Sequence, residues 1–296
     1  MKLTTTETIS NTYKKRGQWG FVWKKLKKSR TAMFGMCVLC VFLGLIIFAD
    51  VIADYEGKAL YQDFMNTRAE PSWEHPFGTD NFGRDMFARV VHGTRTSYAI
   101  GFGSVSIAAI IGVLLGGIAA YKGGIIDTLI TRIMDAMMSV PNLLLALAVM
   151  AALGSGAFNL ALAMVISKTP QFARLIRSSV LTINDQDYIK AAKACGTSDF
   201  RILTKHIIPN AIGPIIVQAT MQVAAVILSA AGLSFIGVGV QPPTPEWGTL
   251  LAENREFLRT DMYLVIFPGL AIILSALSLN MLGDGLRDAL DPKLKN

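Results

Sequence analysis

The sequence predicts an all-α membrane protein with six transmembrane helices. Its composition is 52% hydrophobic and only 17% charged, whereas an ordinary soluble domain is roughly 25% charged. Uncharged runs of at least about 17 residues, the length needed to cross the hydrocarbon of a bilayer, recur along the chain. Basic residues are concentrated in alternate connecting segments. These three observations together indicate a chain that crosses a membrane repeatedly.

Five apolar runs are long enough to span a bilayer, and a sixth is short. The five long runs are residues 31–49, 96–121, 136–153, 211–240 and 262–282. The short run, residues 157–167, ends at Lys168. A short helix that is enclosed by neighbouring helices need not match the lipid thickness by itself. We therefore expect six spans, with bends at Pro141 and Pro268, where a helix loses a backbone hydrogen bond.

The charges of the connecting segments predict the orientation. Residues 1–30 hold nine Lys or Arg and one acidic residue, and residues 168–210 hold seven and three. By contrast, residues 50–95 hold five and eight, and residues 241–262 hold two and four. The positive-inside rule therefore places both termini and the 168–210 segment in the cytoplasm. An odd number of spans would place the acidic 241–262 segment there instead.

These boundaries predict the organisation of the whole chain. A cytoplasmic tail with a basic interfacial segment is expected first, then one transmembrane helix, an extracytoplasmic segment that ends in a short amphipathic helix over 83–95, a membrane core, and a cytoplasmic C-terminal tail. The corresponding ranges are 1–30, 31–52, 53–95, 96–283 and 284–296, with a cytoplasmic loop at 173–210 and an outer loop at 239–262. Small residues in the core, such as Gly112 and Gly116, allow helices to approach closely.

Enzymatic chemistry finds little support in the sequence. Cys37 and Cys40 form a C-x-x-C inside the first apolar run, where we interpret them as buried small residues. The three histidines are predicted to lie on opposite sides of the membrane, and no phosphate-binding G-x-x-x-x-G-K-[ST] motif is present. We expect no catalytic residue, no metal and no cofactor in this chain. An ion-coupled secondary transporter stays open, although acidic residues occur only at the ends of the apolar runs.

A charged island precedes the fifth apolar run. Residues 188–194 are good helix formers, and Gly196 follows where a left-handed C-terminal cap is favoured. A second helix over 198–206 then leads to Pro209, which suits the first turn of the next span. The alanines of the first helix keep its profile thin enough to enter a groove on a partner. An interfacial helix-turn-helix would have much the same composition.

The island resembles the loop by which permease subunits of bacterial ABC importers engage their ATPases, because it combines two alanines, a glycine and an Ile-Ile-Pro-Asn exit. Four further stretches are similar to the dipeptide, oligopeptide and nickel permease family: residues 75–85, 93–97, 237–248 and 282–288. The resemblance extends from about residue 20 to the end and is to the second permease of the pair. One residue departs from the pattern, since Lys190 stands where a glutamate is usual.

The resemblance implies a type I ABC importer fold in the bacterial cytoplasmic membrane, working by alternating access. It implies a second permease, two ATPase subunits that hold ATP and Mg, and an extracytoplasmic substrate-binding protein as partners. Dipeptides or oligopeptides are the implied substrates, with nickel or a metal chelate as the alternative.

Three groups of candidate residues follow. Expected ATPase-coupling residues are Asp187, Tyr188, Lys190, Ala191, Ala192, Ala194, Gly196, Asp199 and Pro209. Candidate pathway residues are the polar side chains within the apolar runs, namely Asn142, Ser167, Gln218, Gln222 and Ser229. Candidate contacts for the binding protein are Arg84, Asp85, Glu246 and Trp247, although Arg84 and Asp85 could equally pair with each other.

Overall fold

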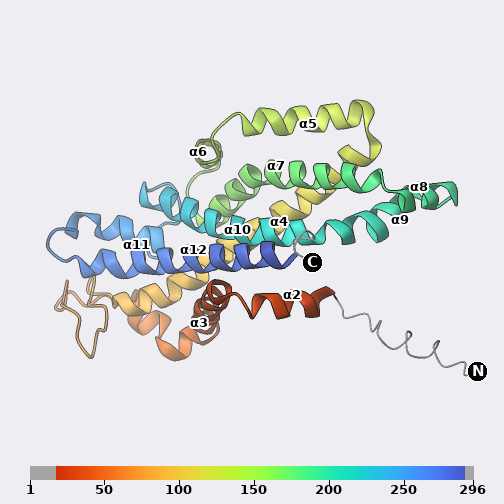
Figure 1. Cartoon of the computed structure of the whole chain (residues 1–296). Helices are drawn as coiled ribbons and strands as arrows, with labels where there is room; N and C mark the ends of the chain where they lie inside the picture. Colours follow the sequence, from red (N-terminus) through yellow and green to blue (C-terminus); the bar gives the residue numbers. More distant parts are fainter. Residues whose placement is uncertain (1–17, 291–296) are drawn as a thin grey trace, which may run out of the picture.

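The computed structural model describes residues 18–290 as an elongated helical bundle (Figure 1). Within that range there is no β-strand, only an isolated bridge between Thr79 and Asp85. The parts of the two expected tails over 1–17 and 291–296 lie outside the described residues. The all-α prediction is confirmed for the described part of the chain.

The helices follow one another with short connections, apart from two longer segments at one end of the bundle. Their bounds are α2 Gln18–Leu26, α3 Arg30–Ile52, α4 Met86–Lys122, α5 Gly124–Met138, α6 Asn142–Leu153, α7 Ala157–Asn184, α8 Asp187–Ala194, α9 Asp199–Ile202, α10 Ile208–Phe235, α11 Trp247–Asn254 and α12 Tyr263–Leu290. Two π-helical stretches, η1 Tyr55–Leu60 and η2 Leu203–Ile207, and the 3-10 turn η3 Arg255–Phe257 complete the set.

Small residues bring α4 and α7 together along their lengths, as the sequence predicts. Gly112 lies against Phe172 and Ala173, and Gly116 lies against the backbone of Ala173 so closely that an added Cβ would overlap its carbonyl group. On the other side of the bundle, Gly35 of α3 faces the Ser278 carbonyl oxygen of α12, where a Cβ would come within 2.6 Å. Close backbone contact of this kind is typical of helices that associate in a membrane.

The number of spans is only partly accounted for by helix length and composition. In the described residues, α3, α4, the continuous η2–α10 helix and α12 are long and apolar enough to cross a bilayer, and the α5–α6 pair would add a fifth span. The helix α7 does not meet the same test. It has the length, but it carries Lys168, Arg174 and Arg177. The total of six and the side on which the termini lie therefore stay predictions.

The third predicted span is wrong in its bounds. A single run over 136–153 was expected, but α5 ends at Met138 and α6 begins at Asn142, with a bend of 92° between the two helices. Pro141 precedes α6 and has an extended conformation, with φ −53° and ψ 133°. Proline also disfavours helical geometry in the residue before it, so the chain turns here. Figure 1 shows α6 end-on beside the horizontal α5.

Two other boundaries differ from the prediction. The short run 157–167 is the first part of a helix that continues through Pro170 to Asn184. The helix expected over 83–95 is not separate, because α4 begins at Met86 and continues into the membrane run without a break. In both places the helix extends beyond the apolar run through residues that include ion-paired arginines, namely Arg89 in α4 and Arg174 and Arg177 in α7.

The expectation that Cys37 and Cys40 are buried is also wrong. Both thiols are exposed on the described chain. The buried face of α3 is formed by other residues, among them Leu39 and Phe42. The two cysteines lie away from this buried face. The sequence did not show this, because the helix is apolar all round and hydrophobicity alone does not identify which face is packed.

Two structural features occupy opposite ends of the bundle (Figure 1). At one end, the segment between α3 and α4 lies near α11; we call residues 54–89 together with α11 the polar lobe. At the other end, α8 and α9 extend beyond the neighbouring helices. This separation places the two main groups of candidate residues far from each other.

Candidate functional site

The turn between α8 and α9 has the geometry that the sequence predicts. Gly196 has φ +74°, in the left-handed region that glycine adopts without steric cost. Its N–H donates to the Lys193 carbonyl at 2.9 Å, and the N–H of Thr197 donates to the Ala192 carbonyl at 3.1 Å. This pair of bonds is a Schellman motif, which ends a helix and reverses the chain. The expected left-handed cap at Gly196 is confirmed.

One apolar face of α8 packs against the bundle. Ile189 is fully buried and belongs to a cluster with Ile176 and Val180 of α7 and with Ile202 and Ile207 beyond the turn. The remaining side chains of α8 are exposed apart from the half-buried Ala192. The helix therefore has one anchored face and one narrow free face that carries Asp187, Tyr188, Lys190, Ala191 and Ala194.

Polar contacts connect this helical pair to three long helices. Tyr121 Oη at the end of α4 donates to Asp199 Oδ1 at 2.7 Å. Asn210 Nδ2 of α10 donates to Tyr188 Oη at 3.3 Å, and Lys193 Nζ donates to Asn184 Oδ1 of α7 at 2.8 Å. A displacement of α8 and α9 would consequently act on α4, α7 and α10 together.

The departure at Lys190 leaves a weakly paired charge on the free face. Its Nζ lies 3.9 Å from Asp187 Oδ1, and both side chains are strongly exposed. An exposed pair at this spacing contributes little stability. Pro209 lies in the first turn of α10, as expected, although α9, η2 and α10 follow one another without a gap and the second helix is therefore not a separate element.

The candidate pathway residues fall into two environments. Gln218 and Gln222 lie on α10, where Gln222 Nε2 donates to Gln171 of α7 and Gln218 lines a cleft of about 410 Å³. Ser167 and Ser229 instead donate to carbonyls of their own helices, at 3.1 and 2.8 Å. Asn142 is half-buried at the start of α6. Of these five candidates, Gln222 is the one with a side-chain hydrogen bond to another described helix.

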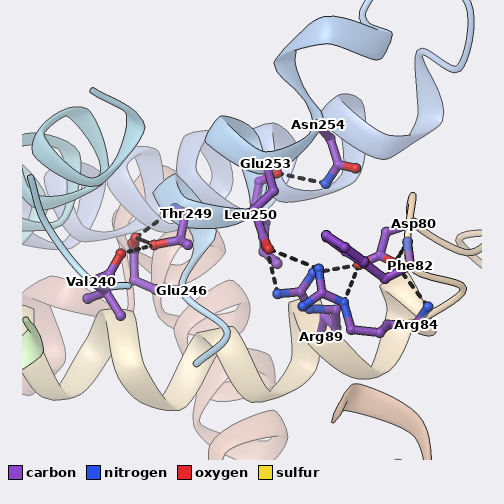
Figure 2. A network of polar contacts seen from close by, with 10 residues as sticks. All are labelled: Asp80, Phe82, Arg84, Arg89, Val240, Glu246, Thr249, Leu250, Glu253 and Asn254. Carbon is purple, nitrogen blue, oxygen red and sulfur yellow. Dashed lines mark hydrogen bonds and ion pairs between the residues drawn. The ribbon is translucent and has the colours of Figure 1, made fainter. Parts of the chain in front are cut away.

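The polar lobe contains a buried ionic network that sequence reasoning identified only in part. Asp80 Oδ2 accepts hydrogen bonds from Arg84 Nε at 2.7 Å and from Arg89 Nη1 at 2.6 Å. Glu253 of α11 accepts from Arg84 Nη2 at 2.9 Å and from Arg89 Nη2 at 2.7 Å. Glu253 is the most exposed of the four side chains, at 11%. Figure 2 shows the two guanidinium groups between the two carboxylates.

Two charges of each sign neutralise each other in this network, and charge-assisted hydrogen bonds of this kind are the strong ones in proteins. Arg84 was expected to contact a partner or to pair with Asp85, but it pairs with Asp80 and Glu253. Arg89 and Glu253 were missed. Their separation of 164 residues in the sequence leaves no local pattern that could have found them.

The other three lobe candidates are buried as well. Asp85 caps α4 by accepting from the Ala88 N–H at 2.8 Å, and it also contacts His75 at 2.8 Å. Glu246 caps α11 by accepting from the Thr249 N–H at 2.9 Å (Figure 2). Trp247 Nε1 donates to the Val90 carbonyl at 3.1 Å. With exposures of 4% or less, Arg84 and these three side chains do not reach a partner's surface in this conformation.

Within residues 18–290, no group of three or more His, Cys, Asp and Glu side chains has the arrangement of a metal site. The groups that the fold does bring together are ionic pairs and helix caps.

The described residues form a helical membrane bundle with a protruding helix-turn-helix at one end and a polar lobe at the other, and two family patterns show the class to which the chain belongs. The pattern of the family described as "binding-protein-dependent transport system inner membrane component" matches residues 112–296. That of the "N-terminal TM domain of oligopeptide transport permease C" matches residues 17–71. The chain belongs to this family of inner-membrane permeases.

Three relatives are similar to this chain over nearly their whole length. The dipeptide transport system permease protein DppC of Alkalihalophilus pseudofirmus is 45% identical over 278 residues, which cover 94% of this chain and 91% of that protein. The di/tripeptide permease DppC of Pseudomonas aeruginosa is 42% identical, with 93% and 92% covered. The glutathione permease GsiD of Escherichia coli O157:H7 is 44% identical, with 95% and 92% covered.

Among solved structures, the inward-facing MetNI methionine ABC transporter has the same core fold. Its matching chain superposes with a TM-score of 0.57 at 19% identity, covering 70% of this chain and 98% of that one. The fold likeness and the family together identify this chain as a multi-pass permease subunit of an ABC importer in the bacterial cell membrane.

Proposed function

We propose that this chain is the second permease of a heteromeric importer for short peptides. The names of the relatives given above specify dipeptides, di- or tripeptides and glutathione as the transported substrates. All of these are short peptides. This favours a peptide over nickel or a metal chelate as the substrate. The proposed assembly contains another permease, two ATPase subunits that bind ATP and Mg, and an extracytoplasmic binding protein. ATP hydrolysis belongs to those partners and not to this chain.

The observation that carries the proposal is the free face of α8. The apolar contacts of α8 with the bundle are made by Ile189 and Ala192, which leaves a narrow exposed surface for a groove on another protein. The proposed coupling residues are those of α8, the Gly196 turn, Asp199 and Pro209. Closure of the ATPases on ATP would move this pair, and the contacts with Tyr121, Asn184 and Asn210 would pass the movement to the bundle. Alternating access follows from that movement.

We propose further that the pathway runs beside α7 and α10, with Gln218 and Gln222 as its main polar groups and Asn142, Ser167 and Ser229 near it. The buried candidates Arg84, Asp85, Glu246 and Trp247 would hold the shape of the polar lobe, and the surface of that lobe would meet the binding protein. The burial of the four side chains supports their structural role in the lobe. The acidic character of the 50–95 and 241–262 segments supports the extracytoplasmic position that contact with the binding protein requires.

Purification of the tagged chain from a gently solubilised membrane tests the proposed function. We expect two ATPase subunits and a second permease to be recovered with it, and we expect the reconstituted complex with its binding protein to accumulate a dipeptide only when ATP is supplied. Accumulation by this polypeptide alone, driven by a proton gradient, would contradict the proposal and favour a secondary transporter.

The six-span topology predicts which side of the membrane Cys195 faces. In a Cys37→Ser/Cys40→Ser background, Cys195 is the one cysteine left, and its thiol is exposed at the end of α8. A membrane-impermeant maleimide should leave intact cells unlabelled and should label inverted vesicles stripped of ATPases. Labelling in intact cells would contradict the cytoplasmic assignment of α8.

A further inference from the structure

Lys168 is a buried cation with no counter-charge in the described part of the chain. It lies in α7, its side chain is 5% exposed, and it makes no ion pair or hydrogen bond with any described residue. Lysine is almost never buried in this way unless it is paired. A charged group inside a membrane protein is costly and usually marks a functional position.

The acidic residues near α7 are already used by other cations. Arg174 Nη2 pairs with Asp135 at 2.5 Å, and Arg177 Nε pairs with Asp127 at 2.6 Å. Both acids come from α5. The helices α6 and α10 and residues 96–121 of α4 contain no Asp or Glu. The structure therefore offers Lys168 no carboxylate from the helices packed against this part of α7.

The surroundings of Lys168 connect it with the candidate pathway. Lys168, Gln171 and Leu175 follow each other at the spacing i, i+3 and i+7, so they share one stripe of α7. Gln171 accepts the hydrogen bond from Gln222 of α10, and the Gln222 Oε1 is buried without a partner in the described residues. Leu175 lines the cleft of about 410 Å³ that also contains Gln218 and Arg287. The stripe therefore runs from Lys168 along α10 to this cleft.

The helix α7, which carries the stripe, and the helix α10, which packs beside it, each contain an internal proline. Pro170 lies two residues after Lys168 in α7, and Pro214 lies in α10 at the cleft. Each proline removes one backbone hydrogen bond and favours a bend. Such bends allow α7 and α10 to separate beside Lys168 without unfolding either helix.

We propose that Lys168 is a carboxylate-binding position of the transport pathway, with the amides of Gln171 and Gln222 as hydrogen-bonding partners of the bound group. The inference rests on the proposed function, because every free peptide carries a C-terminal carboxylate. The substrate itself would supply the missing counter-charge as it passes between α7 and α10. The competing source, an acidic side chain of the neighbouring permease, predicts a different result in the same experiment.

The experiment uses the complete importer in proteoliposomes and a dipeptide as either the free acid or the C-terminal amide. Each form is supplied at a concentration that saturates the binding protein, as verified by direct binding. We expect the wild type to take up the acid faster than the amide. Lys168→Met should lower uptake of the acid at least tenfold and leave the amide within twofold, and Lys168→Arg should keep the preference for the acid. Lys122→Met, at an exposed position, is the matched control and should change neither rate.

The other outcomes overturn the inference. Equal losses for both forms, or failure of both Lys168→Met and Lys168→Gln to assemble, would show that Lys168 pairs with a neighbouring subunit. An unchanged preference in Lys168→Met, or no preference in the wild type, would show that the cation does not meet the substrate. A wild-type complex that takes up neither form would contradict the proposed function as well, which separates that failure from the others.

Discussion

Replacement of Arg89 with methionine is expected to destabilise the protein by about 3–5 kcal/mol, because it leaves the two buried carboxylates Asp80 and Glu253 with the single positive charge of Arg84. Arg89 is fully buried and pairs with both Asp80 and Glu253. Methionine fills much of the volume but cannot hydrogen-bond to either acid, so the polar lobe would carry net negative charge in its interior. Trp247 is fully buried beside the network, so tryptophan fluorescence during denaturation in detergent measures the loss.

Arg68→Met is the matched control for this prediction. Arg68 belongs to the same lobe and pairs with Asp261 at 3.3 Å, but its side chain is 47% exposed. Its loss should cost less than about 1 kcal/mol, since exposed ion pairs are worth little. A second control removes both charges: Arg89→Met with Glu253→Gln should be less destabilised than the sum of the single variants, because the two residues interact directly. Equal effects of Arg89→Met and Arg68→Met would show that the network contributes no special stability.

Replacement of Gly196 with valine is expected to lower ATP-driven uptake at least tenfold while the amount of chain in the membrane stays within twofold. The left-handed conformation at φ +74° costs an ordinary L-residue roughly 1–2 kcal/mol, and the β-branched valine is poorly suited to it. The Schellman turn would open, and α9 would no longer be held against α8. Uptake and ATP hydrolysis of the reconstituted complex are measured together.

Two variants separate the turn geometry from the added side chain. Gly44→Val introduces the same side chain at a helical position with no atom within 4 Å of the new Cβ, and uptake should be unchanged. Gly196→Asn should retain more uptake than Gly196→Val, because asparagine tolerates the left-handed region. Normal uptake by Gly196→Val would mean that the turn does not transmit movement from the ATPases.

The parts of this protein that could be predicted from the sequence are those governed by neighbouring residues. Long uncharged runs predict membrane helices because hydrocarbon excludes unpaired polar groups. The cap at Gly196 could be predicted because it follows a run of helix formers and has no side chain to resist a positive φ. Pro141 correctly indicated a bend, although the run that contains it suggested one span where the chain forms two helices.

The length of α7 could not be predicted in the same way. The apolar run stops at Lys168, yet the helix continues through Arg174 and Arg177 because Asp135 and Asp127 of α5 neutralise them. Those pairs join residues 39 and 50 positions apart. Nothing local to α7 shows that its charges have partners, whereas the fold brings them within hydrogen-bonding distance.

The amino-acid order alone establishes the membrane class, most of the apolar segments and the turn that ends α8, since each depends on hydrophobicity or backbone preference over a few adjacent residues. The folded chain was needed to reveal the ionic network of the polar lobe, the bend between α5 and α6 and the isolation of Lys168. Electrostatic pairing acts through space, and Arg89 meets Glu253 only after α11 has packed beside α4.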